Sequence, residues 1–279
     1  MLKQRVITAL VLLAILLPAL LVPPVWPFAL LSLVAVGAAA WEWGRLNGLS
    51  PGGSLGLGAA VALACGLSWN ATTALGSTPA LWWGAAGGWV VGGALLLRGG
   101  PAGWPRLAQP VRLAIGAVVL WLTWIAMTQA KAEGLNFLLS VFCLVWAADI
   151  AAYFGGRAFG RRKLAPTISP GKSWEGVWSG MAGVLALAVV WTFIERSTGG
   201  GIEPSLYSRL YERAGWGGFV VGCAFLVSMS VVGDLFESLV KRSVGAKDSS
   251  GLLPGHGGVL DRIDALLPVF PIAWTLSRL

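Results

Sequence analysis

Nine apolar segments follow one another along the chain, and charged residues are scarce inside them. Each is close to the roughly 20 residues that a helix needs to cross the hydrocarbon core of a bilayer. They lie near residues 6–22, 26–41, 55–70, 80–97, 111–129, 135–155, 177–194, 216–239 and 259–276. The last segment carries charge in its first turns, so part of it is expected at the membrane interface. The pattern predicts an all-α, polytopic membrane protein with about nine transmembrane helices.

The composition also indicates a bilayer rather than water as the main solvent. Hydrophobic residues make up 56% of the chain and charged residues only 11%, whereas soluble domains carry about 25% charged residues. The N-terminus, "MLKQRVITALVLLAILLPALLVPP", has the basic start and apolar run of a signal peptide. It lacks a clear small-x-small cleavage site, so we interpret it as a first membrane helix that stays in the protein.

Lysine and arginine are distributed unevenly between the two sides of the predicted membrane. With nine spans, one side receives 15 of the 20 basic residues and the other receives five. The positive-inside rule places the richer side, together with the N-terminus, in the cytoplasm. Anionic lipid headgroups account for the net charge of +8, so membrane lipid is the expected partner and nucleic acid is not.

Acidic residues are concentrated in the second half. Glu42 is the only one before Glu133, and the other eleven run from Glu133 onward. We therefore expect residues 1–130 to be a multi-span scaffold that packs and binds lipid, and residues 131–279 to form a catalytic membrane region.

Two carboxylates, Asp149 and Asp234, lie inside predicted spans. A charged aspartate at the centre of a membrane helix costs about 2.5–3.5 kcal/mol on insertion scales, so such residues usually face a polar cavity and serve a function. The alternative is a protonated carboxyl that makes an interhelical hydrogen bond.

Asp234 has polar neighbours at helical spacing. Ser230, Glu237, Ser238 and Lys241 are three or four residues apart and share its face of a helix. The alternative interpretation is an ordinary solvated helix end. This polar stripe, however, extends about two turns into an apolar segment, which a solvated face does not require.

The stretch from Lys247 to Asp264, "KDSSGLLPGHGGVLDRID", interrupts the apolar pattern just before the last span. Its proline and glycines break the helix and allow the backbone to approach a ligand. Asp261 and Asp264 are three residues apart, so both project from one side of the next helix, while Arg262 points elsewhere. His256 is the only histidine; a metal ligand, an acid–base group and a hinge residue are all open roles for it.

Carboxylates without clustered cysteine or histidine favour hard cations, and Mg²⁺ is the one that substrate phosphates commonly complete. Asp234, Asp261 and Asp264 are accompanied by cations that suit phosphoryl or nucleotidyl transfer. These cations are Lys172, Lys241, Arg242, Lys247 and Arg262. The alternative is that each aspartate pairs with a nearby cation, Asp234 with Lys241 and Asp261 with Arg262.

The sequence "PGKS" at 170–173 is not a P-loop, because Pro166 stands where that motif requires glycine and no strand precedes it. Lys172 and Ser173 still lie where a helix is expected to begin, which is a favourable place for a substrate anion.

The stretch "SLVKRSVGAKDSSGLLPGHGGVLDRID", Ser238 to Asp264, resembles the signature of the phosphatidate cytidylyltransferase (CDP-diacylglycerol synthase) family. The matching positions are Ser238, Lys241, Arg242, Lys247, Asp248, Pro254, His256, Gly257, Gly258, Asp261, Arg262 and Asp264. "DIAAYFGGRAFGRRKLAPTISPGKSWEG" and "GDLFES" are also similar to this family, so the resemblance covers roughly residues 145–265.

The resemblance implies that CTP and phosphatidate react to give CDP-diacylglycerol and pyrophosphate, with Mg²⁺ as cofactor. It also implies a multi-pass protein of the bacterial inner membrane, often a homodimer, whose site faces the cytoplasm. Asp234 and Asp261 match the metal-binding aspartates of the family. Lys241, Arg242, Lys247 and Asp248 match its motif without an assigned role for each.

Two other functions stay open at this point. A transporter could relay protons through Asp149 and Asp234, although the charged cluster lies at one membrane face. Another CTP-dependent lipid transferase or kinase could use the same site on a related lipid.

Overall fold

The computed structural model describes residues 2–198 and 203–278 of the chain. Its first half contains α1 (Leu2–Leu21), α2 (Trp26–Leu46), α3 (Pro51–Ser68), η1 (Trp69–Ala71), α4 (Thr72–Gly76), α5 (Pro79–Gly87), η2 (Gly88–Gly92), α6 (Gly93–Gly103), η3 (Trp104–Arg106) and α7 (Gln109–Glu133). Its second half contains α8 (Leu135–Phe159), β1 (Lys163–Ala165), β2 (Ser169–Ser173), α9 (Trp174–Ser197), α10 (Leu206–Ser243), α11 (Leu260–Ile263) and α12 (Leu266–Leu276). The predicted all-α fold is confirmed.

In the described part of the chain, seven helical segments are long and apolar enough to cross a membrane, and they coincide with the seven predicted spans between residues 26 and 239. The first predicted span corresponds to a shorter apolar stretch, Val6–Leu21. The last corresponds to α12, which has only 11 residues. The protein is therefore a multi-pass membrane protein, and the predicted number of about nine spans is approximate, because the helices at the two ends of the chain are the least clear spans.

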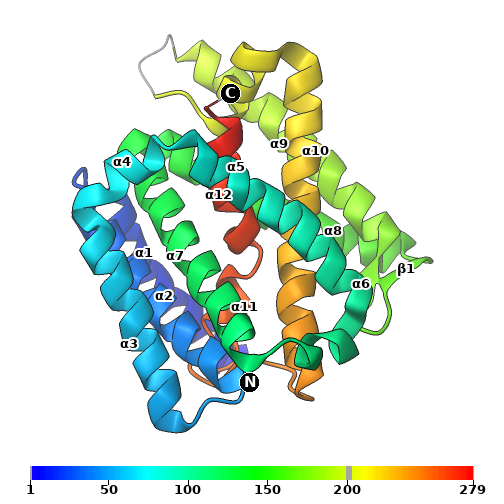
Figure 1. Ribbon diagram of the computed structural model, residues 1–279. Helices are drawn as coiled ribbons and strands as arrows, with labels where there is room; N and C mark the ends of the chain where they lie inside the picture. The colour runs from blue at the N-terminus through cyan, green and yellow to red at the C-terminus, as the bar shows by residue number, and fades with distance from the viewer. Residues whose placement is uncertain (1, 199–202, 279) are drawn as a thin grey trace.

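Helix α12 is too short to cross a bilayer, and it lies inside the bundle instead. It packs against α5, α7, α8 and α10, and its residues from Leu266 to Thr275 are all buried (Figure 1). The Trp274 indole donates to the Gly76 carbonyl at 2.9 Å. An apolar helix surrounded on all sides by other helices needs no polar face, which explains why its sequence resembles a membrane span.

Helix α10 changes direction at Gly215, whose φ of 61° and ψ of −164° lie outside the helical region. A positive φ of this kind is accessible to glycine at little cost. The apolar part of α10 therefore begins at Trp216, which agrees with the predicted start of that span.

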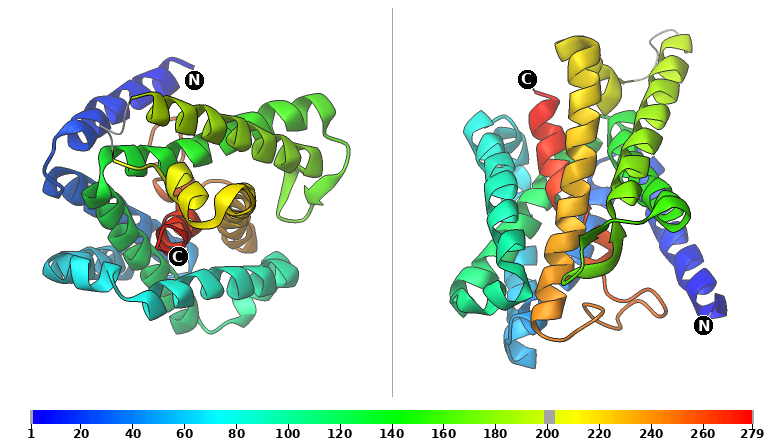
Figure 2. Two further views of the ribbon diagram at one scale, coloured as in Figure 1. Left: turned by 90° about the horizontal axis from the view of Figure 1, so that it is seen from above. Right: turned by 90° about the vertical axis from the view of Figure 1, so that its right-hand side faces the viewer.

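The connections gather at two opposite ends of the bundle. The start of α1, the α2–α3 connection, the β1–β2 hairpin and the loop after α10 lie toward one end, and the end of α9, the start of α10 and the end of α12 lie toward the other (Figures 1 and 2). The hairpin is antiparallel, with Lys163 opposite Ser173. The first end contains the connections that the charge distribution assigns to the basic side.

Candidate active site

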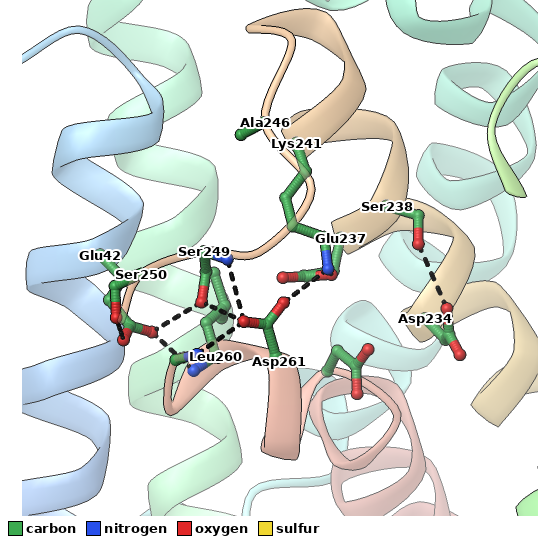
Figure 3. Close-up of polar contacts among 12 residues, drawn as sticks. Glu42, Asp234, Glu237, Ser238, Lys241, Ala246, Ser249, Ser250, Leu260 and Asp261 are labelled. Carbon is green, nitrogen blue, oxygen red and sulfur yellow. Dashed lines mark hydrogen bonds and ion pairs between the residues drawn. The ribbon is translucent and has the colours of Figure 1, made fainter. Parts of the chain in front are cut away.

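Polar side chains from both halves of the chain meet at this basic end (Figure 3). Helix α10 supplies Asp234, Glu237 and Lys241, and α2 supplies Glu42. Residues 244–259, here called the polar loop, run from the end of α10 to α11, which supplies Asp261. The loop can return because the glycines at 245, 255 and 257 have φ values of 69°, 76° and 82°.

Asp261 lies at the centre of the hydrogen-bond network. Its Oδ2 accepts from the Ser249 and Gly258 amides at 2.9 and 2.7 Å, and from the Ser249 hydroxyl at 2.8 Å. Its Oδ1 accepts from Lys241 Nζ at 2.5 Å. Burial alone would raise the pKa of Asp261, but the Lys241 ammonium and these loop donors outweigh it and lower the pKa to about 2. Asp261 is therefore ionised at neutral pH.

Lys241 bridges two acidic side chains. Its Nζ contacts Glu237, one helical turn earlier, as well as Asp261. The three side chains are 12%, 1% and 5% exposed, respectively. Among the described residues, Lys241 is the only cation paired with Glu237. The Lys241 ammonium thus lies between two carboxyl groups that water scarcely reaches.

A second pair lies beside a cavity of about 500 Å³ between α8, α9, α10 and the β1–β2 hairpin. Lys172 Nζ is 2.6 Å from Asp234 Oδ2, and Asp149 lines the same cavity. Ser173 caps α9, accepting from the Gly176 amide at 3.2 Å. The predicted helix start at Lys172–Ser173 is therefore confirmed, and both residues line the cavity.

Asp264 follows α11, and its Oδ1 accepts from the Ala265 amide at 2.8 Å. Burial, and then the nearby Asp234 carboxylate, raise the pKa of Asp264 well above its ordinary value of 3.8. A carboxyl in this environment ionises readily only when a cation is near.

The other predicted site residues lie at the edge of this network. Arg242 is exposed, and its Nη1 donates to the Ala246 carbonyl at 3.0 Å. Lys247, Asp248 and Arg262 are exposed as well. The His256 amide donates to the Leu253 carbonyl at 2.8 Å, while its buried Nδ1 has no hydrogen-bond partner. The exposed side chains of Lys247 and Asp248 can contact a ligand from the polar loop.

Asp234 pairs with Lys172 and not with Lys241, its expected neighbour. Asp261 pairs with Lys241 and not with Arg262. Among the described residues, no three histidine, cysteine, aspartate or glutamate side chains form a ready-made metal cage.

Sequence analysis did not assign Glu42, Asp149 or Glu237 to the site. Glu42 is buried on α2, and its carboxylate contacts the polar loop more than 200 residues later in the chain. The available signal was that Glu42 is a lone carboxylate in an apolar helix, which is a reason to expect a function. The expected scaffold in residues 1–130 thus contributes a side chain to the network.

Comparison with known proteins identifies the family of the chain. The model of the cytidylyltransferase family matches residues 3–279. The chain is 40% identical to the phosphatidate cytidylyltransferase of Pseudomonas aeruginosa, over 98% of this chain and 95% of that protein. It is 39% identical to the Haemophilus influenzae protein of the same name, over 97% and 96% of the two chains. A match of this extent excludes a chance likeness of one motif, and the chain belongs to the cytidylyltransferase family of nucleotidyltransferases.

Proposed function

We propose that this nucleotidyltransferase transfers CMP from CTP to phosphatidate, giving CDP-diacylglycerol and pyrophosphate. The observation that carries the proposal is the 40% identity to a phosphatidate cytidylyltransferase over almost the whole of both chains. The site is consistent with it, because lysines and carboxylates lie at one end of a membrane-spanning bundle. One substrate is a soluble nucleotide and the other a lipid, so the reaction needs a site where water meets acyl chains.

In the proposed reaction, a phosphate oxygen of phosphatidate attacks the α-phosphorus of CTP. The new P–O bond forms as the bond from the α-phosphorus to the α,β-bridging oxygen breaks, and pyrophosphate leaves with that electron pair. A phosphate monoester is already largely ionised at neutral pH, so no general base is required. Lys172 and the start of α9 would hold a substrate phosphate in the cavity.

Mg²⁺ is proposed as the cofactor, held by Asp234 and Asp261 together with CTP phosphates. The residues fit this role: Asp234 Oδ1 accepts from the Ser238 hydroxyl at 3.3 Å, and Asp261 Oδ1 accepts from Lys241 Nζ. Each of these oxygens keeps acceptor capacity. Such a cation would offset the repulsion between two anionic substrates. Asp264 is placed to respond to it, because a nearby cation favours the ionised carboxylate.

We also propose that the protein resides in the inner membrane of a bacterium with this site facing the cytoplasm. The positive-inside rule supports that orientation, because the site lies at the end that carries the basic connections. A homodimer stays a prediction, which the mass of the detergent-solubilised protein would test.

The function is tested by mixing purified protein with Mg²⁺, phosphatidate and CTP labelled in the cytidine. Labelled CDP-lipid and an equal amount of pyrophosphate are expected. Diacylglycerol or dolichol offered in place of phosphatidate tests the alternative of a lipid kinase, for which a phosphorylated lipid and CDP would appear. Production of no CDP-lipid in vesicles that contain folded protein would refute the proposal.

The shared metal is tested with Asp234→Asn, Asp261→Asn and the double variant. Either single change should cost orders of magnitude in rate, and the double change little more, because residues that act as a unit are non-additive. Glu133→Gln is the matched control, since Glu133 forms ion pairs with Arg209 and Arg278 away from the site. Unchanged Mg²⁺ dependence in either single variant would exclude a shared metal.

A further inference from the structure

Glu42 is a buried carboxylate whose partners are all hydrogen-bond donors of one segment. Its residue is 0% exposed, and among the described residues no ion pair involves it. The Ser250 hydroxyl and the Val259 amide donate to Oε1 at 2.6 and 3.0 Å. The Leu260 amide lies 2.7 Å from Oε2, and the Ser249 hydroxyl lies 3.1 Å from it. A buried carboxylate without a cation persists only where several donors satisfy it.

These four donors come from the two ends of one excursion of the chain. Ser249 and Ser250 lie where the polar loop turns away from α10, and Val259 and Leu260 lie where it enters α11 (Figure 3). The carboxylate of α2 therefore joins the two ends of the segment that contains His256. The Thr8 hydroxyl of α1 also donates to the Pro254 carbonyl, at 2.9 Å. Helices α1 and α2, both in the first half of the chain, thus hold the polar loop in place.

Ser249 couples Glu42 to Asp261. Its Oγ lies 2.8 Å from Asp261 Oδ2 and 3.1 Å from Glu42 Oε2, but a hydroxyl has one hydrogen to donate. The shorter contact favours donation to Asp261, and Glu42 then keeps three donors. Gly258 packs between the two acids, and a Cβ there would lie 2.3 Å from Glu42 Oε1. A displacement of Glu42 would therefore move both Ser249 and Gly258, which hold Asp261.

We infer that Glu42 is a positioning residue for the reaction: it fixes the polar loop so that Asp261 and Lys241 keep the places in which they act. Its role in catalysis rests on the function proposed above, whereas its hold on the loop does not. A purely structural role, in which Glu42 only packs α2 against α11, predicts lost stability without a specific loss of turnover.

Glu42→Gln is the decisive variant. Whichever way the glutamine amide turns, its NH₂ group faces the backbone N–H of Val259 or Leu260, because one of these donors lies at each carboxylate oxygen. Loss of a residue that orients site ligands typically costs about 10- to 100-fold in activity. We expect kcat to fall by this factor while the KM for phosphatidate stays near that of the wild type.

Hydrogen exchange supplies a readout that does not depend on activity. In Glu42→Gln, the amides of Val259 and Leu260 should exchange about tenfold faster or more, which corresponds to the loss of one hydrogen bond to a charged group. Glu133→Gln is the matched control: it makes the same chemical change at a structural ion-pair site. It should leave both kcat and loop exchange unchanged.

Ser250→Ala serves as a milder second variant if Glu42→Gln does not fold. It removes one donor to Glu42 and should show smaller changes in kcat and exchange in the same direction. Unchanged loop exchange in the folded variants overturns the inference, as does faster exchange with an unchanged kcat. If the wild type transfers no CMP, the proposed function fails; faster loop exchange then still supports the anchoring by Glu42, and unchanged exchange refutes it.

Discussion

Lys241→Met tests whether the network owes its stability to one buried ammonium. In the wild type, Lys241 contacts Glu237 and Asp261, and all three side chains are at most 12% exposed. After the change, Asp261 would keep its donors from Ser249 and Gly258. Glu237 would keep no cation, because Lys241 is the only one paired with it among the described residues. The main cost therefore falls on Glu237.

The size of this cost follows from burial. Removal of one partner from a buried ion pair typically destabilises a protein by about 3–5 kcal/mol, whereas replacement of both partners by apolar residues of similar volume is often neutral. Lys241→Met alone should lower the unfolding free energy by about 3–5 kcal/mol. The double variant Lys241→Met/Glu237→Met should recover most of that loss, since the Glu237 carboxyl that lost its partner is removed as well. Asp261 accounts for the part that is not recovered.

The assay is equilibrium unfolding by SDS of the protein in mild detergent, followed by tryptophan fluorescence. It needs no enzymatic turnover, so the proposed catalytic role of Lys241 does not affect the result. A loss below about 1 kcal/mol for the single variant would match an exposed ion pair and refute the reasoning. A double variant no more stable than the single one would show that Glu237 is not the group left without a partner.

Three further results are expected. A Cβ at Gly258 would come within 2.1 Å of a serine hydroxyl of the same loop, so Gly258→Ala should lose most activity. Gly251→Ala, with no atom within 4 Å of the added Cβ, should lose little; equal losses would contradict the packing. Membrane-impermeant thiol reagents applied to intact cells should label a cysteine at Glu212, which is exposed near the start of α10, and not one at Arg161, between α8 and β1; the reverse pattern would invert the orientation. Because the pKa of Asp261 is about 2, below its ordinary 3.8, its stabilising contacts are present above about pH 4 and are lost as the pH falls toward 2. The stability difference between wild type and Asp261→Asn should thus be constant from about pH 8 to pH 5, and a steady decline across that range would refute the lowered pKa.

The helices were predictable where one local property decides the structure. Length and apolar content identify the seven helices that can cross a membrane, and serine before an acidic first turn identifies the start of α9 at Ser173. The bend at Gly215 agrees with the predicted start of a span. Local sequence did not separate α12 from a membrane span, because a helix enclosed by other helices and a helix enclosed by lipid are both apolar on all sides.

The site was predictable in its residue types and only partly in its pairings. Helical spacing placed Asp234, Glu237 and Lys241 on one face, but it could not show that Lys241 turns to Glu237 and Asp261 while Asp234 meets Lys172. The contacts of Glu42 span more than 200 residues of sequence. The periodicity of a sequence indicates which face of a helix is polar. Which side chains pair across helices depends on tertiary packing, and periodicity contains no information about that packing.

The balance of charge in the site links these pairings to the proposed chemistry. Five carboxylates influence one another electrostatically across α8, α10 and the α11–α12 region, while Lys172 and Lys241 are the only cations paired with them in the described chain. The carboxylates are Asp149, Asp234, Glu237, Asp261 and Asp264. This excess of carboxylates opposes binding of a nucleoside triphosphate unless a cation or bound protons offset the negative charge. A divalent cation that arrives with CTP would serve both needs, because it neutralises the phosphates and lets Asp264 ionise. If the proposed function holds, this excess of carboxylates would favour Mg²⁺-bound CTP over metal-free CTP.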